Sequence, residues 1–362
     1  MKFLKFAIVA MVAAAVSGCG SKVKVPEGTA AVAYLQADKA IDALVDGAKD
    51  VVDDLPDSLK KMGGDVDAQL KEFLKQKEEN FDKYVKINWV LFGAVADEKK
   101  LSSEPQPFVV VNVKIKDMKT FDENVKGMGE TKIGDARTWK IPFSTDSLSS
   151  FVPVPREVSR MFRNASLHIG LLKDSYVLVA TSEDQLKALV ELYSGNGKES
   201  PDFKDIAELE GDAFLKIAVK PVGALLQNNS YLKERLTNVA AVSGDQELLE
   251  ALYGVKRVVV QAGVKYGLSG ATLTVEAGTS AAADFFESLF NVGKFFLRGY
   301  TDWALYEAVN GGVPVKDLAK YGNMIREGIE VDRSGTDVSF KTFVNVKDML
   351  RFGLKDFENL MK

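Results

Sequence analysis

The sequence predicts an α+β protein in which antiparallel sheets carry helices packed on one face. Short runs of alternating apolar residues recur along the chain, and several are joined in pairs by tight-turn residues, a pattern typical of antiparallel strands. Such a strand repeatedly leads into an amphipathic helix across an Asp, Ser or Pro. The composition, 46% hydrophobic with 29 Gly and 10 Pro in 362 residues, is that of a folded chain of about two domains.

The first half of the chain carries three strand-to-helix junctions. Asp117 and Ser182 stand just before two of these helices, where their side chains can accept hydrogen bonds from the free N–H groups of the first turn. Lys173-Asp174 provides a hairpin turn. The expected strands are Val32–Leu35, Tyr84–Val95, Phe108–Ile115, Leu167–Leu172 and Tyr176–Ala180, and the expected helices are Lys39–Val45, Asp57–Tyr84, Met118–Val125 and Glu183–Tyr193.

The second half repeats this organisation. Pro221 suits the first turn of a helix, because the N–H that proline lacks needs no partner there. Arg333-Ser334-Gly335 joins two alternating runs and indicates a hairpin. The expected strands are Phe214–Val219, Val255–Tyr266, Leu268–Val275, Ile329–Asp332 and Val338–Val346, and the expected helices are Pro221–Leu226, Tyr231–Tyr253, Ala281–Phe290 and Met349–Leu360.

Both halves therefore follow the order β-α-α-β-β-α-β-β-α, which predicts an internal duplication. A short motif agrees with it: Asn112-Val113 followed by Lys116-Asp117-Met118 is echoed by Asn345-Val346-Lys347-Asp348-Met349. Coincidence among common strand-to-helix junctions is the alternative. The stretch Ser194–Pro201 is rich in turn-forming residues and is expected to link the two repeats. The expected repeats are residues 29–195 and 202–362.

The N-terminus has the features of a signal peptide. Lys2 and Lys5 precede Phe6–Val16, an apolar run without a break. This run is too short to cross a bilayer as a helix, which takes about 20 residues. We therefore expect residues 1–18 to be a signal peptide.

The residues that end this segment, Val16-Ser17-Gly18-Cys19, resemble the lipobox of bacterial lipoproteins. The resemblance implies cleavage before Cys19, a diacylglycerol on its sulfur and an acyl chain such as palmitate on its amino group. Gly20, in place of the Asp that retains such proteins at the inner membrane, implies the outer membrane. An ordinary signal peptide with Cys19 as an incidental buried residue is the alternative.

Residues 19–28 are expected to form a tether that reaches at most roughly 30 Å. Two or three acyl chains would hold the protein firmly, at about 0.8 kcal/mol for each buried CH₂ group. The duplicated pattern behind a lipobox is also similar to uncharacterised bacterial lipoproteins. That similarity implies a surface or periplasmic protein of unassigned role.

The composition argues against several classes of chemistry. The formal charge of −4 gives no basic surplus for a nucleic-acid partner. A single Cys and a single His, His168, exclude cysteine-based zinc sites and histidine-pair metal centres. The Ser58–Lys61 stretch has a Ser-x-x-Lys spacing but lacks the partner motifs of that enzyme class. We expect no cofactor, no metal and no catalytic residues, so that the protein is not an enzyme.

One aromatic-rich segment, Phe285–Tyr306, has two apolar stripes at helical spacing. Core packing between the two halves of the chain is the main expectation for such stripes. A lipid-facing patch or a groove for an apolar ligand are the alternatives. The candidate ligand-binding residues are Phe285, Phe286, Phe290, Phe296 and Trp303.

Together these features predict a lipid-anchored envelope protein with a non-enzymatic binding or structural role. Its partners would be the membrane, through the N-terminal lipid, and an envelope protein or an apolar ligand. Two alternatives remain open. One is a carrier that encloses an apolar or lipid ligand, and the other is a hydrolase that uses two carboxylates.

Overall fold

The computed structural model describes residues 22–37, 39–40, 75, 83–96, 106–142, 166–211, 213–220, 222–228, 233–234, 237–238, 246–265, 268–310 and 328–345. Contacts divide the chain into two compact units, which we describe separately. Among the described residues, the first unit runs to Ala207 and the second begins at Glu208. This boundary lies beyond the predicted linker: Phe203 and Ile206 are buried, and Ser200 donates a backbone hydrogen bond to Val25.

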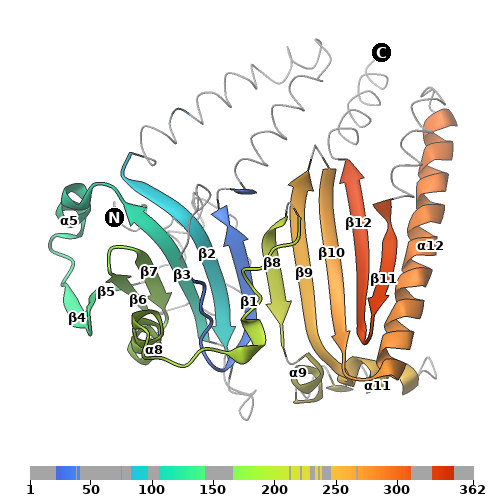
Figure 1. Cartoon of the computed structure of the whole chain (residues 1–362), viewed down its shortest axis with the longest axis horizontal. Coiled ribbons are helices and arrows are strands. Elements are labelled where there is room, and N and C mark those ends of the chain that lie inside the picture. The colour runs from blue at the N-terminus through green and yellow to red at the C-terminus, as the bar shows by residue number, and fades with distance from the viewer. Residues whose placement is uncertain are drawn as a thin grey trace. The chain divides into compact units, whose positions relative to one another are not determined.

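The first unit contains an antiparallel sheet with the strand order β1-β2-β3-β7-β6-β5-β4 (Figure 1). Its strands are β1 (Thr29–Gln36), β2 (Val85–Val95), β3 (Gln106–Ile115), β4 (Thr131–Ile133), β5 (Ala136–Pro142), β6 (Ser166–Leu172) and β7 (Tyr176–Ala180). The predicted hairpin between β6 and β7 is confirmed. Lys173 and Asp174 lie at the centre of its turn with left-handed φ values of 51° and 50°, and the Ser175 N–H closes the turn by donating to the Leu172 carbonyl at 3.1 Å.

Helices α5 (Met118–Val125) and α8 (Glu183–Ser194) lie on opposite faces of this sheet. Phe121 of α5 contacts Trp139, which is buried with Ile169 of β6. Leu186 of α8 lies instead over Gly170. Because neighbouring strand residues point to opposite faces, the two helices cover different sides. The sequence-based expectation that helices pack on one face is thus wrong for this unit. A short 3-10 helix, Pro201–Phe203, follows α8.

The predicted helix caps at Asp117 and Ser182 are confirmed. The Asp117 carboxylate accepts a hydrogen bond from the Thr120 N–H at 3.0 Å, and these bonds with Thr120 hold the pKa of Asp117 below its usual value. The Ser182 hydroxyl accepts one from the Gln185 N–H at 3.2 Å. These contacts satisfy N–H groups that the first helical turn leaves without partners.

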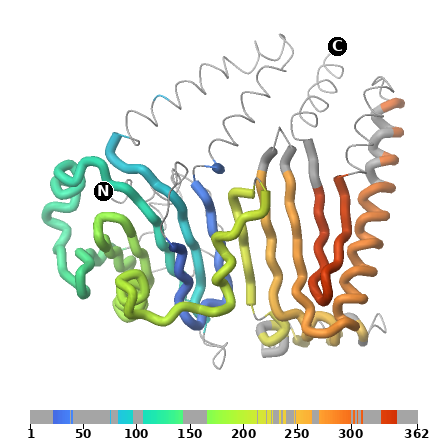
Figure 2. The backbone as a smooth tube through the Cα atoms, in the orientation of Figure 1, coloured from blue at the N-terminus to red at the C-terminus, as the bar shows by residue number. Residues whose placement is uncertain are grey.

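The second unit contains an antiparallel sheet with the strand order β8-β9-β10-β12-β11 (Figure 1). Its strands are β8 (Ala213–Val219), β9 (Val255–Lys265), β10 (Leu268–Ala277), β11 (Glu330–Ser334) and β12 (Asp337–Asn345), and its helices are α9 (Val222–Asn228), α11 (Gln246–Tyr253) and α12 (Ser280–Asn310). Figure 2 follows this backbone from β8 in yellow to β12 in red. Helix α12 contacts β10, β11, β12 and α11.

The strand orders of the two units share a pattern. The order β1-β2-β3-β7-β6 in the first unit corresponds to β8-β9-β10-β12-β11 in the second. In each, the last two strands form a hairpin whose second strand pairs with the third strand of the unit. The first unit carries the additional strands β5 and β4 beyond β6.

Two features differ from the sequence-based expectation. The sequence predicts no hairpin at β4 and β5. Helix α12 spans 31 residues, well beyond the helix expected at Ala281–Phe290, in line with the helical spacing of apolar residues after Phe290. Several predictions concern residues outside those the structure describes. They are the signal peptide, Cys19, most of the helix at Lys39–Val45, most of the helix at Asp57–Tyr84, Ser58–Lys61 and the helix at Met349–Leu360.

Candidate functional site

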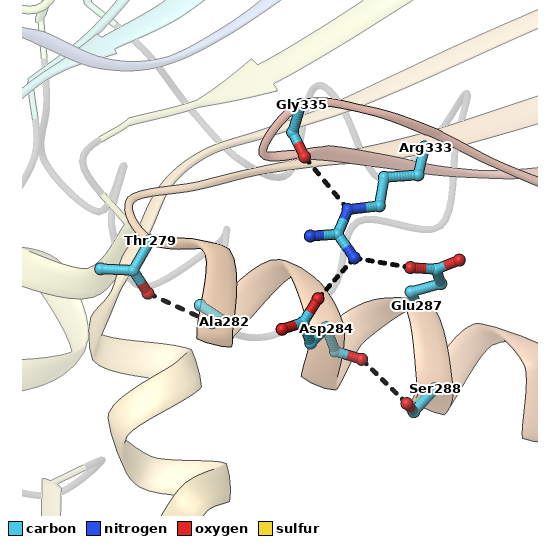
Figure 3. Close-up of polar contacts among 7 residues, drawn as sticks. All are labelled: Thr279, Ala282, Asp284, Glu287, Ser288, Arg333 and Gly335. Atoms are coloured by element: carbon cyan, nitrogen blue, oxygen red, sulfur yellow. Dashed lines mark hydrogen bonds and ion pairs between the residues drawn. The ribbon is translucent and has the colours of Figure 1, made fainter.

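Helix α12 begins with its side chains packed on the sheet of the second unit. Ala282, Ala283 and Phe286 are buried, and they pack with Val275 of β10 and Val338 of β12. The hydroxyl of Thr279 accepts a hydrogen bond from the Ala282 N–H at 3.2 Å, which caps the first turn (Figure 3). This part of the helix is an ordinary component of the core.

An arginine on the β11–β12 hairpin fixes the same part of α12 in place. One guanidinium nitrogen, Nη1, of Arg333 contacts Asp284 and lies 2.7 Å from the Glu287 carboxylate, while Nε donates to the Gly335 carbonyl at 3.1 Å (Figure 3). Hydrogen bonds to Glu287 and Asp284 raise the pKa of Arg333 above its ordinary value. The first two turns of α12 are therefore held to the hairpin by charge as well as by packing.

Further along α12, large apolar side chains are exposed. Phe295 is 75% exposed, Phe296 69% and Trp303 56%, whereas Phe286 is only 6% exposed. Figure 1 shows α12 running beside β11 and continuing past the end of that strand. The exposed large apolar residues of this helix are Leu289, Val292, Phe295, Phe296, Leu297, Trp303, Tyr306 and Val309.

Most of these exposed residues lie along one side of α12. At about 100° of rotation per residue, the line through Leu289, Val292, Phe296, Trp303 and Tyr306 covers an arc of about 100°. Phe295 widens this arc to about 120°. Ala283, Phe286 and Phe290 lie on the other side of the helix, which faces the sheet. We call the exposed arc, formed by Leu289, Val292, Phe295, Phe296, Trp303 and Tyr306, the aromatic face of α12.

The predicted ligand-binding residues differ in burial along α12. Phe286 is buried, and Phe285 and Phe290 are half-buried against the core cluster. The ring of Phe290 also lies 5.6 Å from that of Phe340 on β12. Phe296 and Trp303 belong to the aromatic face instead.

Phe286 and Phe290 of one stripe thus pack on the sheet of the second unit itself, whereas Leu289, Val292 and Phe296 of the other stripe are exposed. The reason is geometric. The sheet covers one side of the helix, and periodicity alone does not tell which stripe meets it.

The first unit contains a second arginine-centred cluster. Arg137 Nη1 donates to Asp122 at 2.7 Å, and its Nε and Nη2 donate to the two carboxylate oxygens of Glu130 at 3.0 and 2.8 Å. The guanidinium also lies over the rings of Phe121 and Trp139. The hydrogen bond from Arg137 lowers the pKa of Glu130. A carboxylate held ionised in this way is typical of a structural ion pair, since a catalytic acid needs a raised pKa.

Among the described residues, no three His, Cys, Asp or Glu side chains come together as a metal site would need. His168 lies half-buried on β6, at the position paired with Lys140. None of the helices that the structure describes combines the length and the apolar character needed to cross a bilayer.

Comparisons with known proteins give few matches. No protein-family description matches the sequence, and no curated protein matches it. Among solved structures, the chain is similar to crystal form I of TP0453, with 8% identity and a TM-score of 0.37, over 93% of this chain and 98% of that one. It is also similar to crystal form III of TP0453, with 8% identity and a TM-score of 0.35, over 92% of this chain and 99% of that one.

Proposed function

We propose that this protein is a lipid-anchored protein of the bacterial envelope that binds rather than catalyses, and that the aromatic face of α12 lies on the bilayer. The observation that carries the proposal is the exposure of Phe295, Phe296 and Trp303 along one side of a single helix. Exposed apolar residues are common singly, but a continuous row of them marks a surface that contacts an apolar partner.

A lipid surface suits the chemistry of this face. Burying a Phe side chain contributes about 1.5–3 kcal/mol, so two exposed Phe residues provide enough energy for a stable surface contact. Trp and Tyr are favoured at the boundary between acyl chains and headgroups, because one end of each ring is apolar and the other forms hydrogen bonds.

The width of the aromatic face favours a bilayer over a partner helix. A coiled-coil seam is narrow, with one residue in each half-turn directed at the partner. Here Phe295 and Phe296 are neighbours in the chain, both are strongly exposed, and together they extend the arc to about 120°. A broad arc of this kind is typical of a helix that lies along a membrane interface.

The lipobox-like residues that end at Cys19 provide the means of reaching that bilayer. A lipid on this cysteine would keep the chain at the membrane surface, so the aromatic face would need only modest affinity of its own. Gly20 supports an outer-membrane address in a two-membrane host. The shared strand order of the two units supports an internal duplication, which we infer as the origin of the fold.

The two alternatives are less well supported. A carrier shelters its ligand in a largely enclosed site, whereas Phe296 and Trp303 are more than half exposed. A carboxylate-based hydrolase needs one carboxyl group with a raised pKa. The acidic pair of Asp284 and Glu287 is bound by Arg333.

The proposal can be tested by vesicle binding of the mature chain carrying Cys19→Ser, so that the lipid does not contribute. We expect Phe295→Ser with Phe296→Ser to weaken binding to phosphatidylcholine–phosphatidylglycerol vesicles at least about tenfold. Phe92→Ser is the matched control, because Phe92 of β2 is also an exposed Phe, at 37%. Equal binding by the double variant and the control would contradict the proposal.

A further inference from the structure

The chain that follows the proposed lipid site is fixed to the first unit almost at once. The Lys24 N–H donates to the Tyr193 hydroxyl at 3.2 Å, and that hydroxyl donates to the Lys24 carbonyl at 2.7 Å. The Lys24 ammonium group donates to the Leu192 carbonyl at 3.1 Å. One residue is therefore held three times by the last turn of α8.

The next residues continue this contact as a short strand-like pairing. Val25 is 1% exposed, its carbonyl accepts a hydrogen bond from the Ser200 N–H at 2.8 Å, and Pro26 forms a β-bridge with Glu199. Burial of the Tyr193 ring raises the pKa of its hydroxyl, which therefore stays protonated and able to donate. Residues 24–28 thus belong to the folded unit rather than to a tether.

This contact shortens the tether. The sequence-based tether runs from Cys19 to residue 28, but the structure fixes the chain from Lys24 onward. Five residues span at most about 17 Å when fully extended. A unit of this size has a radius of gyration of about 15 Å and is roughly 40 Å across. The tether is shorter than the unit is wide, so a lipid on Cys19 cannot leave every side of the unit equally close to the bilayer.

The structure assigns the side of the first unit that faces the bilayer: it is the surface around the last turn of α8 and residues 195–198. This inference rests on the proposed lipidation of Cys19. Asn196 and Lys198 are exposed on this surface. The α5 side, on the opposite face of the sheet, then lies away from the membrane. The partner of this surface is the headgroup region of the bilayer that holds the lipid anchor.

The test uses the full mature lipidated protein in vesicles that contain an energy-acceptor dye on lipid headgroups. Cys19 is the only cysteine in the chain, so an introduced cysteine is the only free thiol once that sulfur carries a lipid. A donor dye is attached at Asn196→Cys or, as the matched control, at Glu123→Cys on α5; both positions are exposed. We expect energy transfer at least about twofold higher from position 196, given the size of the unit. Equal transfer, or higher transfer from position 123, would overturn the inference.

A longer tether provides the second measurement. Insertion of about 20 Gly and Ser residues after Gly20 adds a flexible chain with a mean span of about 25 Å. We expect the difference between positions 196 and 123 to disappear in this variant. Its persistence would contradict the role of the short tether.

Anchoring is measured separately, as the fraction of protein that stays with the vesicles after a carbonate wash, compared with Cys19→Ser. Loss of both proteins in the wash would refute lipidation and the proposed anchor. Retention of the native chain with equal transfer from both positions would refute only the orientation.

Discussion

Helices α8 and α12 each follow a β-hairpin, and each has apolar residues at helical spacing, yet the two bury them differently. In α8 every large apolar side chain is buried: Leu186, Leu189, Val190, Leu192 and Tyr193. In α12 only the first turns are buried, and the aromatic face that follows is exposed. A helix that is no longer than the sheet beneath it buries all its large apolar side chains. A helix that extends beyond the sheet leaves the apolar side chains of its outer turns exposed.

The ends of the two helices explain the difference in length. Helix α8 ends at Gly195, whose φ of 102° is left-handed and whose N–H bonds back to the last turn. A Cβ on Gly197 would lie 2.5 Å from the Leu192 backbone, so glycine is required for this close turn. In α12, Gly293 and Gly299 have no such neighbours, and the helix continues through both.

The largest expected effect is a difference in the free energy of unfolding between variants on the buried side and variants on the exposed side of α12. Phe286→Ala should lower the free energy of unfolding of the second unit by about 3–5 kcal/mol, because it leaves a cavity in the core. Phe296→Ala should change it by less than about 0.5 kcal/mol, because the side chain is mostly exposed. Denaturant unfolding of the two variants measures this contrast. Similar losses from both would show that Phe296 is part of the core.

A smaller effect is expected from the helix caps. Ser182→Ala and Thr279→Ala each remove the acceptor for one N–H of the first turn, in α8 and α12 respectively. Each should cost about 1 kcal/mol in chemical unfolding. Replacement by Asp should retain most of the stability, since Asp also accepts this hydrogen bond. A cap variant without any loss would show that water satisfies the N–H equally well.

The contacts of Arg333 that join α12 to the β11–β12 hairpin are expected to contribute less to stability than a helix cap. Arg333→Gln removes the contacts with Asp284 and Glu287, which are partly exposed and so screened by solvent. We expect a small loss of thermal stability that vanishes in about 1 M salt. A loss that is independent of salt would assign the role of Arg333 to packing rather than to charge.

The smallest expected effect is a pH dependence of the stability that the contact between Glu130 and Arg137 gives to the first unit. Glu130 has a lowered pKa in the folded state, so its contact with Arg137 stabilises the protein above the ordinary carboxyl pKa and is lost as the pH falls through the folded value. Glu130→Gln should therefore be less stable than the native chain at pH 7, and the difference should be smaller at about pH 3, which lies below the ordinary carboxyl pKa. Unfolding curves at both pH values measure it. An equally large difference at low pH would contradict the electrostatic origin.

Local signals predicted much of the fold. The hairpin turn at Lys173-Asp174 and the caps at Asp117 and Ser182 depend on neighbouring residues only, and all three are confirmed. The β4–β5 hairpin was missed because β4 has only three residues, which is too short for a periodic pattern. Its signal was Gly134-Asp135, where Gly134 has a φ of 56°.

The candidate site was harder to predict than the fold. The sequence indicates the aromatic residues of α12, but whether each apolar stripe is buried or exposed depends on where the sheet ends. Phe286 and Phe296 are equally apolar, and only tertiary structure buries the first and exposes the second.

The most direct test of the central claim uses Trp303 as its own probe. The chain has three Trp residues, of which Trp89 and Trp139 are buried at 5% and 2% exposure and Trp303 is 56% exposed. The lipidated protein is placed in vesicles whose acyl chains carry bromine, a short-range quencher of indole fluorescence. We predict a loss of emission that Trp303→Phe abolishes. Unchanged emission in brominated vesicles would contradict the contact between the aromatic face of α12 and the bilayer.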